Sequence, residues 1–196
     1  MTRLAVLLAA LAGALGLSLA AADEPTKRAE PPGPGFAVAT FAAGCFWCVE
    51  PPYDKTEGVV STTSGYTGGK VAGATYRQVG MGGTGHAEAV RVVFDPSKLS
   101  YADLLDKWFF RMHDPTTKNR QGNDVGSQYR SAIFVTSQAQ RKIAEEAKIR
   151  AGKSGRWKNP IVTEIVEAGT WTPAESYHQD YLQKNPGGYT CHYLRD

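Results

Sequence analysis

The sequence has few cysteines and little net charge, and each shortage excludes a class of protein. Only three cysteines occur among 196 residues, too few for a small domain held together by disulfide bonds. The net charge of +3 is too weak for a dedicated nucleic-acid-binding protein, so no polyanionic partner is implied. Hydrophobic residues make up 42% of the chain, which excludes wholesale disorder and predicts one globular domain.

A long hydrophobic run lies at the N-terminus. Residues 1–22 contain Arg3, a stretch rich in Leu and Ala, and a small residue at Ala22, a pattern typical of a secretory signal peptide. An uncleaved membrane anchor is the alternative, because about 17 to 25 apolar residues can cross a bilayer. Residues 23–35 are rich in Pro, Gly and charged side chains and predict a flexible leader. The folded domain is therefore expected over residues 36–196, in a protein exported to the periplasm.

Hydrophobic periodicity divides the folded part into strands and helices. It predicts strands at 36–43, 59–66, 86–94, 131–136 and 161–168, and helices from Cys45, at 101–112, at 137–152 and from Thr172 to about Gln183. Two long polar loops interrupt this order at 67–85, which holds seven glycines, and at 113–129. The order predicts an α/β fold, a two-layer sandwich built on a split βαβ ferredoxin-like unit with large functional loops.

The candidate nucleophile is a cysteine at the junction between the first strand and the first helix. Cys45 follows Gly44 and precedes Phe46, Trp47 and Cys48. Free backbone N–H groups at a helix N-terminus stabilise a thiolate, and cysteines so placed titrate at about 3.5 to 7.5 instead of about 8.5. The alternative is a pair of buried structural cysteines packed beside aromatic side chains.

The same segment permits other functions. Cys45 and Cys48 have the spacing of a thioredoxin-type redox pair, so a general thiol–disulfide oxidoreductase is an alternative. Against it, the Pro51–Pro52 pair is expected to interrupt the long helix that such a motif opens. A non-catalytic secreted binding domain is a second alternative. A zinc site from these cysteines, Cys191 and His192 would lack a second close cysteine pair, so no metal site is predicted.

An acidic residue falls on the apolar face of the third predicted strand. Glu88 projects to the same side as Val90, Val92 and Phe94. Burial there should raise the pKa of Glu88 and keep its carboxyl protonated, able to donate a hydrogen bond. An ion pair with Arg91 at a solvated edge is the alternative.

Six short motifs occur in the order found in one enzyme family. They are Gly44-Cys45-Phe46-Trp47, Gly65-Tyr66-Thr67-Gly68-Gly69, Thr75-Tyr76-Arg77, Thr84-Gly85-His86-Ala87-Glu88, Gly122-Asn123-Asp124 and Gln128-Tyr129-Arg130-Ser131. In this order they resemble type A peptide methionine sulfoxide reductases, which are specific for the S epimer of the sulfoxide. The resemblance runs from about Phe36 to Tyr193. It implies an α/β sandwich around a split βαβ unit, and methionine sulfoxide in proteins, peptides or free form as the substrate.

The resemblance also implies a role for each matching residue. A sulfoxide is a poor electrophile until its oxygen is protonated or strongly hydrogen-bonded. Cys45 is then the nucleophile that attacks the sulfur, and Glu88 the acid beside the oxygen. Tyr76 and Tyr129 match the two phenols that hold this oxygen, and Asp124 matches a carboxylate that helps to order the pocket.

The remaining steps need an apolar wall and a second thiol. Phe46 and Trp47 are expected to receive the S-methyl group. A second cysteine must condense with the sulfenic acid left on Cys45. The family commonly carries it in the C-terminal tail, which favours Cys191. Cys48, where the family often has Gly or another small residue, is the alternative. The resemblance implies no prosthetic group and a thioredoxin-like external dithiol as reductant, and a monomer without a nucleic-acid partner or stable membrane insertion is expected.

Overall fold

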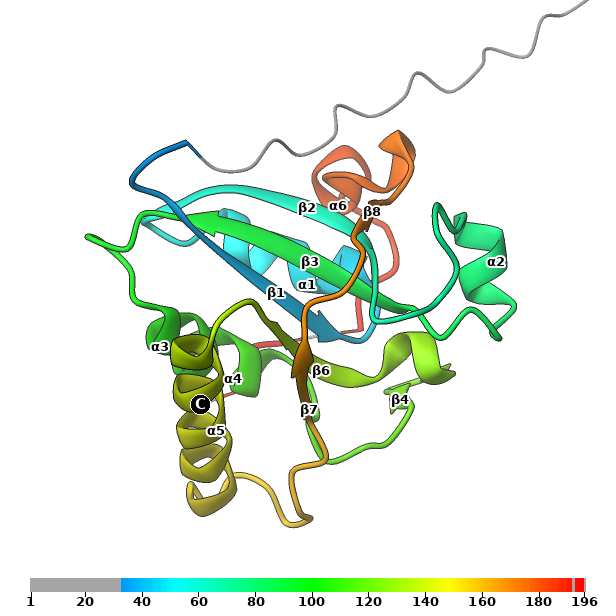
Figure 1. Cartoon of the computed structure of the whole chain (residues 1–196). Helices are drawn as coiled ribbons and strands as arrows, with labels where there is room; N and C mark the ends of the chain where they lie inside the picture. Colours follow the sequence, from blue (N-terminus) through cyan, green and yellow to red (C-terminus); the bar gives the residue numbers. More distant parts are fainter. Residues whose placement is uncertain (1–32, 192, 196) are drawn as a thin grey trace, which may run out of the picture.

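The computed structural model describes residues 33–191 and 193–195 (Figure 1). The strands are β1 (Ala37–Ala43), β2 (Val59–Thr67), β3 (Ala87–Phe94), β4 (Arg120–Gln121), β5 (Asp124–Val125), β6 (Ser131–Val135), β7 (Glu164–Glu167) and β8 (Thr172–Pro173). The helices are α1 (Phe46–Asp54), α2 (Tyr76–Gly80), α3 (Tyr101–Asp103), α4 (Phe110–Met112), α5 (Gln138–Lys153) and α6 (Tyr181–Lys184). Shorter or wider helical turns are η1 (Leu104–Phe109), η2 (Ser127–Tyr129) and η3 (Ser176–His178).

The main sheet has six strands in the order β7-β6-β1-β3-β2-β8. Both β1 and β2 pair antiparallel with β3, so they run parallel to each other with β3 inserted between them. Helix α1 connects β1 to β2, which makes this segment the split βαβ unit predicted from the sequence. β6 continues the sheet antiparallel to β1, and β7 is parallel to β6. β4 and β5 form a separate small hairpin.

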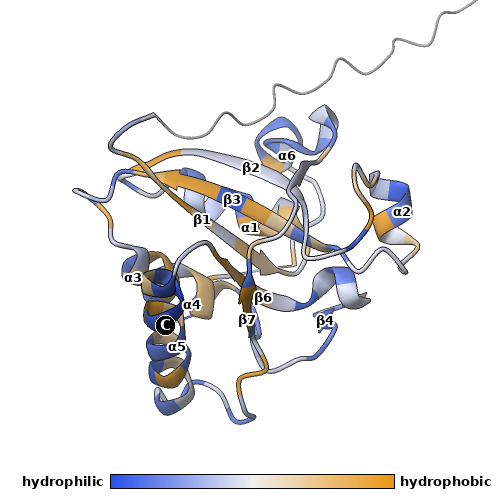
Figure 2. Cartoon of the chain, viewed as in Figure 1, coloured by the Kyte–Doolittle hydropathy of each residue, from blue (hydrophilic) through white to orange (hydrophobic). Residues whose placement is uncertain are grey.

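One face of the sheet carries most of the hydrophobic core. Phe41 of β1, Val90 and Val92 of β3 and Ile133 of β6 are fully buried on this face, against residues of α1, η1 and α5. Figure 2 shows the concentration of hydrophobic residues along β1, β3 and β6 and the hydrophilic outer surface of α5. A smaller cluster on the other face includes Phe134 and is covered by Trp171. The molecule is therefore a two-layer sandwich.

The helix predicted over 101–112 is found, but its centre is wider than an α-helix. A capping box starts it: the Ser100 hydroxyl accepts the Asp103 backbone N–H, and the Asp103 carboxylate accepts the Ser100 backbone N–H. The central segment η1 is a π-helix, in which the backbone bonds span five residues. This widening leaves Phe110 buried and Trp108 only partly buried.

Two further predictions, an interruption of α1 and a helix start at Thr172, are corrected. Helix α1 continues through Pro51 and Pro52 to Asp54, although these residues lack the N–H that a helix interior normally uses. No helix starts at Thr172. Thr172 and Pro173 form strand β8 instead, because they pair with the edge of β2. Helical structure follows only as η3 and the short α6, which are separated by Asp180 in a left-handed conformation with φ 53°.

The two long loops contain short helices and strands that the sequence did not predict. Thr75 and Gln78 form a capping box that starts α2 within the first loop. The second loop folds into the β4–β5 hairpin and the turn η2. The expected signal peptide at 1–22 and the leader up to residue 32 lie outside the described residues. Within the part of the chain that the structure describes, no helix is both long and apolar enough to cross a membrane.

Candidate active site

The site is built at the N-terminus of α1, where the chain leaves the core strand β1. Gly44 adopts φ 95°, a left-handed conformation that side chains disfavour and glycine tolerates. This turn places Cys45 at the N-cap of α1, and its carbonyl accepts the N–H of Cys48 at 3.0 Å. The predicted junction of strand, glycine, cysteine and helix is therefore present.

Glu88 of β3 lies directly against this helix start. Its Oε2 accepts the backbone N–H of Phe46 at 3.1 Å, and its side chain is only 2% exposed. Burial is the main cause that raises the pKa of Glu88 to about 8, and the Phe46 N–H opposes the rise. The carboxyl is therefore mostly protonated at neutral pH, as the strand pattern predicts. The alternative of a solvated ion pair with Arg91 is wrong, because Arg91 contacts the ring of Trp171 on the other face.

The electrostatics of Cys45 differ from the sequence expectation. The pKa of the Cys45 thiol is raised. Hydrogen bonds with Cys191 and Cys48 are the largest causes, and burial and the charge of Glu88 add to them. The helix N-terminus alone predicted a lowered pKa. The correction has a tertiary cause, because the C-terminal tail brings Cys191 against the thiol. Moving Cys191 away and keeping Glu88 neutral would both favour the thiolate.

The three cysteines form one cluster. The Sγ atoms of Cys48 and Cys191 are 2.8 Å apart, and the backbone N–H of Cys191 donates to Cys48 Sγ at 3.0 Å. A hydrogen bond with Cys45 favours the thiolate of Cys191, but the hydrogen bond with Cys48 and burial raise its pKa. None of the three is in a disulfide bond. Both Cys48 and Cys191 interact with the Cys45 thiol, so each is a candidate to react with an oxidised Cys45.

The other polar residues expected at the site converge on Glu88. Tyr76, at the start of α2, and Tyr129, at the end of η2, are both partly buried, and burial followed by the charge of Glu88 raises the pKa of each phenol. Asp124 of β5 accepts a hydrogen bond from Tyr189 at 3.1 Å. Burial raises its pKa, and Tyr189 opposes the rise. Elements from both long loops therefore supply protonated donors around the thiol and Glu88.

Phe46 and Trp47 have different environments, although both were expected to form the apolar wall. Phe46 is 1% exposed and packs in the core against Tyr66 and His178. Trp47 is partly buried and stacks on Tyr181 with ring centroids 3.7 Å apart. Its Nε1–H donates to His178 Nδ1 at 2.9 Å. Trp47 is therefore the more accessible of the two rings and is fixed from two sides.

A family model described as peptide methionine sulfoxide reductase matches residues 37–196. The chain belongs to the peptide methionine sulfoxide reductase family. It is 51% identical over 157 residues to peptide methionine sulfoxide reductase MsrA 1 of Mesorhizobium japonicum, covering 80% of this chain and 88% of that protein. Its structure is similar to Mxr1 of Saccharomyces cerevisiae in reduced form, with a TM-score of 0.79 and 38% identity over 85% of this chain and 96% of that one. A structure of Mxr1 in complex with Trx2 matches with a TM-score of 0.59 and 26% identity over 87% of this chain and 97% of that one.

These comparisons confirm the family, fold class and enzyme class predicted from the sequence. The chain is an oxidoreductase that reduces methionine sulfoxide, and the alternatives of a general thiol–disulfide oxidoreductase and a non-catalytic binding domain are superseded. The roles of individual residues within this methionine sulfoxide reductase remain predictions. Among the described residues no group of three or more His, Cys, Asp or Glu side chains has a metal-binding arrangement, and His192 lies outside them.

Residues without a predicted catalytic role support the reductase site. Glu175 accepts hydrogen bonds from the Tyr66 hydroxyl and the Tyr76 backbone N–H, both at 2.9 Å. His178 is buried, which lowers its pKa, and its ring centroid lies 4.4 Å from that of Tyr76. The contacts of Glu175 and His178 with α1 and α2 join residues about a hundred or more positions apart, so local spacing could not reveal them.

His86 has a structural role in the reductase fold. Its Nδ1 accepts the Gly69 backbone N–H at 3.1 Å, and its Nε2 lies 2.7 Å from the Val71 carbonyl oxygen. A Cβ atom at Gly69 would lie 2.4 Å from the backbone nitrogen of His86, so only glycine fits there. His86 thus fixes the glycine-rich loop that leads to Tyr76.

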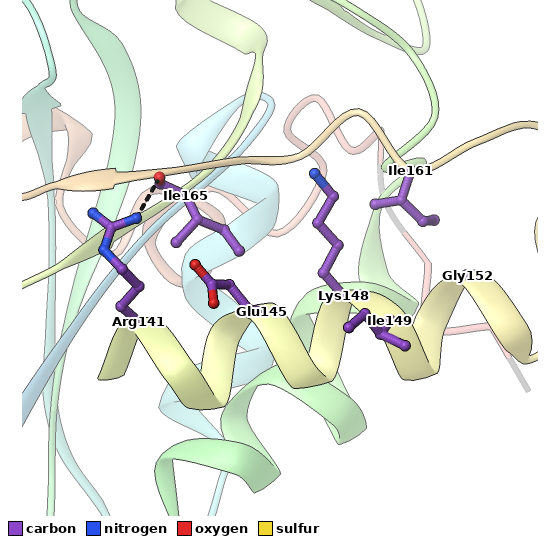
Figure 3. Close-up of a pocket in the computed structure, with 7 residues that line it drawn as sticks. All are labelled: Arg141, Glu145, Lys148, Ile149, Gly152, Ile161 and Ile165. Atoms are coloured by element: carbon purple, nitrogen blue, oxygen red, sulfur yellow. Dashed lines mark hydrogen bonds between the residues drawn. The ribbon is translucent and has the colours of Figure 1, made fainter. Parts of the chain in front are cut away.

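A groove of about 670 Å³ lies elsewhere, between α5 and β7, and Figure 3 shows its lining. Arg141 donates to the carbonyl oxygen of Ile165 at 3.1 Å, and Lys148 donates to that of Thr163 at 2.7 Å. Strand β7 is an edge of the sheet, and these side chains occupy a carbonyl group of β7 and that of Thr163, the residue before it. The groove is thus a protected sheet edge and contains none of the reductase site residues.

Proposed function

We propose that Cys45 attacks the sulfur of methionine sulfoxide while Glu88 donates a proton to the oxygen. The hydrogen bond between Phe46 N–H and Glu88 Oε2 carries this proposal, because it places a buried, protonated carboxyl at the helix start that holds Cys45. With Oε2 engaged as an acceptor, the carboxyl proton sits on Oε1 and is available to the sulfoxide oxygen. Methionine then leaves, and the oxygen remains on Cys45 as a sulfenic acid.

The neighbouring side chains fit the polar and apolar ends of this substrate. Tyr76 and Tyr129 are protonated phenols near Glu88 and can donate hydrogen bonds to the sulfoxide oxygen. Asp124 orders this pocket through Tyr189. Phe46 and Trp47 receive the S-methyl group, with Trp47 supplying the more accessible ring. We assign the S epimer, in protein-bound, peptide or free methionine sulfoxide, because the residue pattern is that of type A enzymes.

Cys191 is the proposed resolving cysteine, and Cys48 is the alternative. Cys191 condenses with the sulfenic acid on Cys45, which forms a disulfide and releases water. The hydrogen bond between Cys191 and Cys45 supports this pairing. The 2.8 Å separation of Cys48 and Cys191 also permits a later exchange between them.

Thiol counting and mass spectrometry after one turnover test the chemistry. Reduced protein incubated with a methionine sulfoxide peptide should form methionine and lose two thiols per molecule, and Cys45→Ser should do neither. Cys191→Ser should retain a sulfenic acid on Cys45, whereas Cys48→Ser should form a Cys45–Cys191 disulfide. An intact disulfide in Cys191→Ser would assign resolution to Cys48 instead.

A thioredoxin-like dithiol is the proposed reductant, and no prosthetic group is required for the balance of electrons. Support comes from the yeast relative crystallised with Trx2. Residues 1–22 are proposed to be a signal peptide and 23–35 a leader, followed by the catalytic domain over 36–196, acting as a monomer in the periplasm without nucleic acid or a retained membrane anchor. The N-terminal mass of the exported protein tests this: a mature chain starting near Asp23 is expected, and retention of residues 1–22 would favour an anchor.

A further inference from the structure

The C-terminal tail is attached on both sides of Cys191. On the N-terminal side, the Tyr189 hydroxyl donates to Asp124 at 3.1 Å. At the centre, the Cys191 N–H donates to Cys48 Sγ. The tail then returns to the body of the protein at Arg195, four residues after Cys191. The position of the thiol therefore depends on contacts within the site and on one attachment, at Arg195, outside it.

The attachment on the C-terminal side joins Arg195 to Arg111 and Trp157, which are both far from it in sequence. The Arg195 N–H donates to the Arg111 carbonyl oxygen at 3.0 Å, and Arg111 Nε donates to the Arg195 carbonyl oxygen at 2.6 Å. The Arg195 guanidinium lies 5.3 Å from the ring centroid of Trp157 and 4.2 Å from that of Tyr193. Arg111 belongs to α4, so the end of the tail is fixed to the helical layer.

These contacts are strong enough to affect where the thiol lies. The hydrogen bonds with Arg111 and the cation–π contact with Trp157 each restrain the end of the tail. Without them the tail beyond Tyr189 would sample many conformations. The effective concentration of the Cys191 thiol at Cys45 would then fall.

We propose that Arg195, seated on Trp157 and Arg111, is a positioning residue for the resolving step. It holds Cys191 at the three-cysteine cluster so that the thiol meets the sulfenic acid as soon as it forms. This inference rests on the proposed function, with Cys191 as the resolving cysteine. Arg195 takes no part in the attack of Cys45 on the sulfoxide.

The step that Arg195 assists is balanced without an added reagent. The Cys191 sulfur attacks the Cys45 sulfenic acid, the S–S bond forms and the S–O bond breaks. The thiol proton leaves with the hydroxyl group as water. Cys191 is oxidised, and the sulfenic sulfur of Cys45 is reduced to the disulfide level.

Rapid-quench kinetics on the full chain separate the two steps. Methionine release measures the first step, and loss of trappable sulfenic acid measures resolution. Arg195→Ala keeps the backbone hydrogen bonds to Arg111 but removes the guanidinium contact with Trp157. It should therefore slow resolution by about two- to fivefold and release methionine no more slowly than the wild type. Arg195→Lys should recover most of the rate, since an ammonium retains the cation–π contact. Trp157→Ala should slow resolution similarly, and combining it with Arg195→Ala should add little.

Arg150→Ala is the matched control, because it removes a surface arginine that pairs with Asp106 and contacts none of the described tail residues. It should leave both rates unchanged. Resolution at the wild-type rate in Arg195→Ala, or equal slowing in Arg150→Ala, would overturn the proposal. Hydrogen peroxide generates the same sulfenic acid without sulfoxide, so resolution can also be timed independently of the proposed substrate. A Cys45–Cys48 disulfide formed under peroxide would overturn the role of Arg195, whereas absence of methionine from the sulfoxide peptide would refute the proposed function alone.

Discussion

Helix α1 contacts two buried glutamates, and the comparison between them shows what makes one a catalytic candidate. Glu88 meets the helix start, and Glu50 lies on the helix itself; they are 2% and 1% exposed. Each accepts a backbone N–H, from Phe46 at 3.1 Å and from Asp180 at 2.9 Å. Burial is the main cause that raises their pKa values, to about 8 for Glu88 and about 7 for Glu50.

The difference lies in what surrounds each carboxyl. Glu88 interacts with Cys45, Tyr76 and Tyr129, which together supply a nucleophile and two hydrogen-bond donors. Glu50 is surrounded by Asp54 and Asp180 and joins α1 to the segment before α6. A raised pKa is therefore a weak sign of catalysis by itself, and the adjacent thiol is the deciding feature.

The sharpest test replaces each glutamate with glutamine. Glu88→Gln removes the transferable proton, so kcat/KM should fall by roughly 10² to 10⁴, the range for a general acid. Glu50→Gln should change kcat/KM by less than about threefold, because its amide oxygen can still accept the Asp180 N–H and no proton is transferred there. Steady-state assays with a sulfoxide peptide and dithiothreitol measure both. A loss below about tenfold in Glu88→Gln would refute its assignment as the acid.

The pH dependence of activity should also separate the two sites. Glu88 donates only when protonated, so the rate of methionine release should fall as pH rises through about 8. Glu50→Gln should leave this fall in place, and Glu88→Gln should abolish it on its residual activity. Single-turnover rates between pH 6 and 10 provide the measurement. A profile in Glu88→Gln that keeps the same fall would assign it to another group.

A smaller effect is expected on stability. Glu50 has a raised pKa in the folded state, so its ionisation favours unfolding as pH rises from about 4.5 to about 7. Its contribution to stability is fully present below pH 4.5 and is lost as pH rises through 7. Glu50→Gln should therefore raise the free energy of unfolding at pH 8 by about 1 to 3 kcal/mol and give no such gain at pH 4.5. Urea unfolding at both pH values tests this, and an equal gain at both would indicate a packing effect instead.

The sequence predicted the positions of β1, β2, β3, β6 and α5 well because each has a strong hydrophobic period or cap. Ser137, for example, caps α5 by accepting the Gln140 backbone N–H. It failed at Thr172–Pro173, where a local cap pattern competes with pairing to β2. Local spacing contains no information about such an edge, since the partner residues lie more than a hundred positions earlier.

The candidate site was predicted to a similar extent. Cys45 and Glu88 were identified from the helix start and the strand alternation, and motif resemblance supplied Tyr76, Tyr129 and Asp124. The raised pKa of Cys45 was not foreseen, because it depends on the approach of a tail 146 residues away in sequence.

The sequence by itself determined the family, the split βαβ order, and a thiol at a helix start with an acid on a neighbouring strand. These features follow from local patterns: hydrophobic period, a glycine that permits the turn, and motifs in order. Only the tertiary structure decided which groups surround that thiol, how Glu50 differs from Glu88, and how Arg195 fixes the tail. Those properties depend on distances and burial between segments far apart in the chain, and both arise only when the sheet and helices pack together.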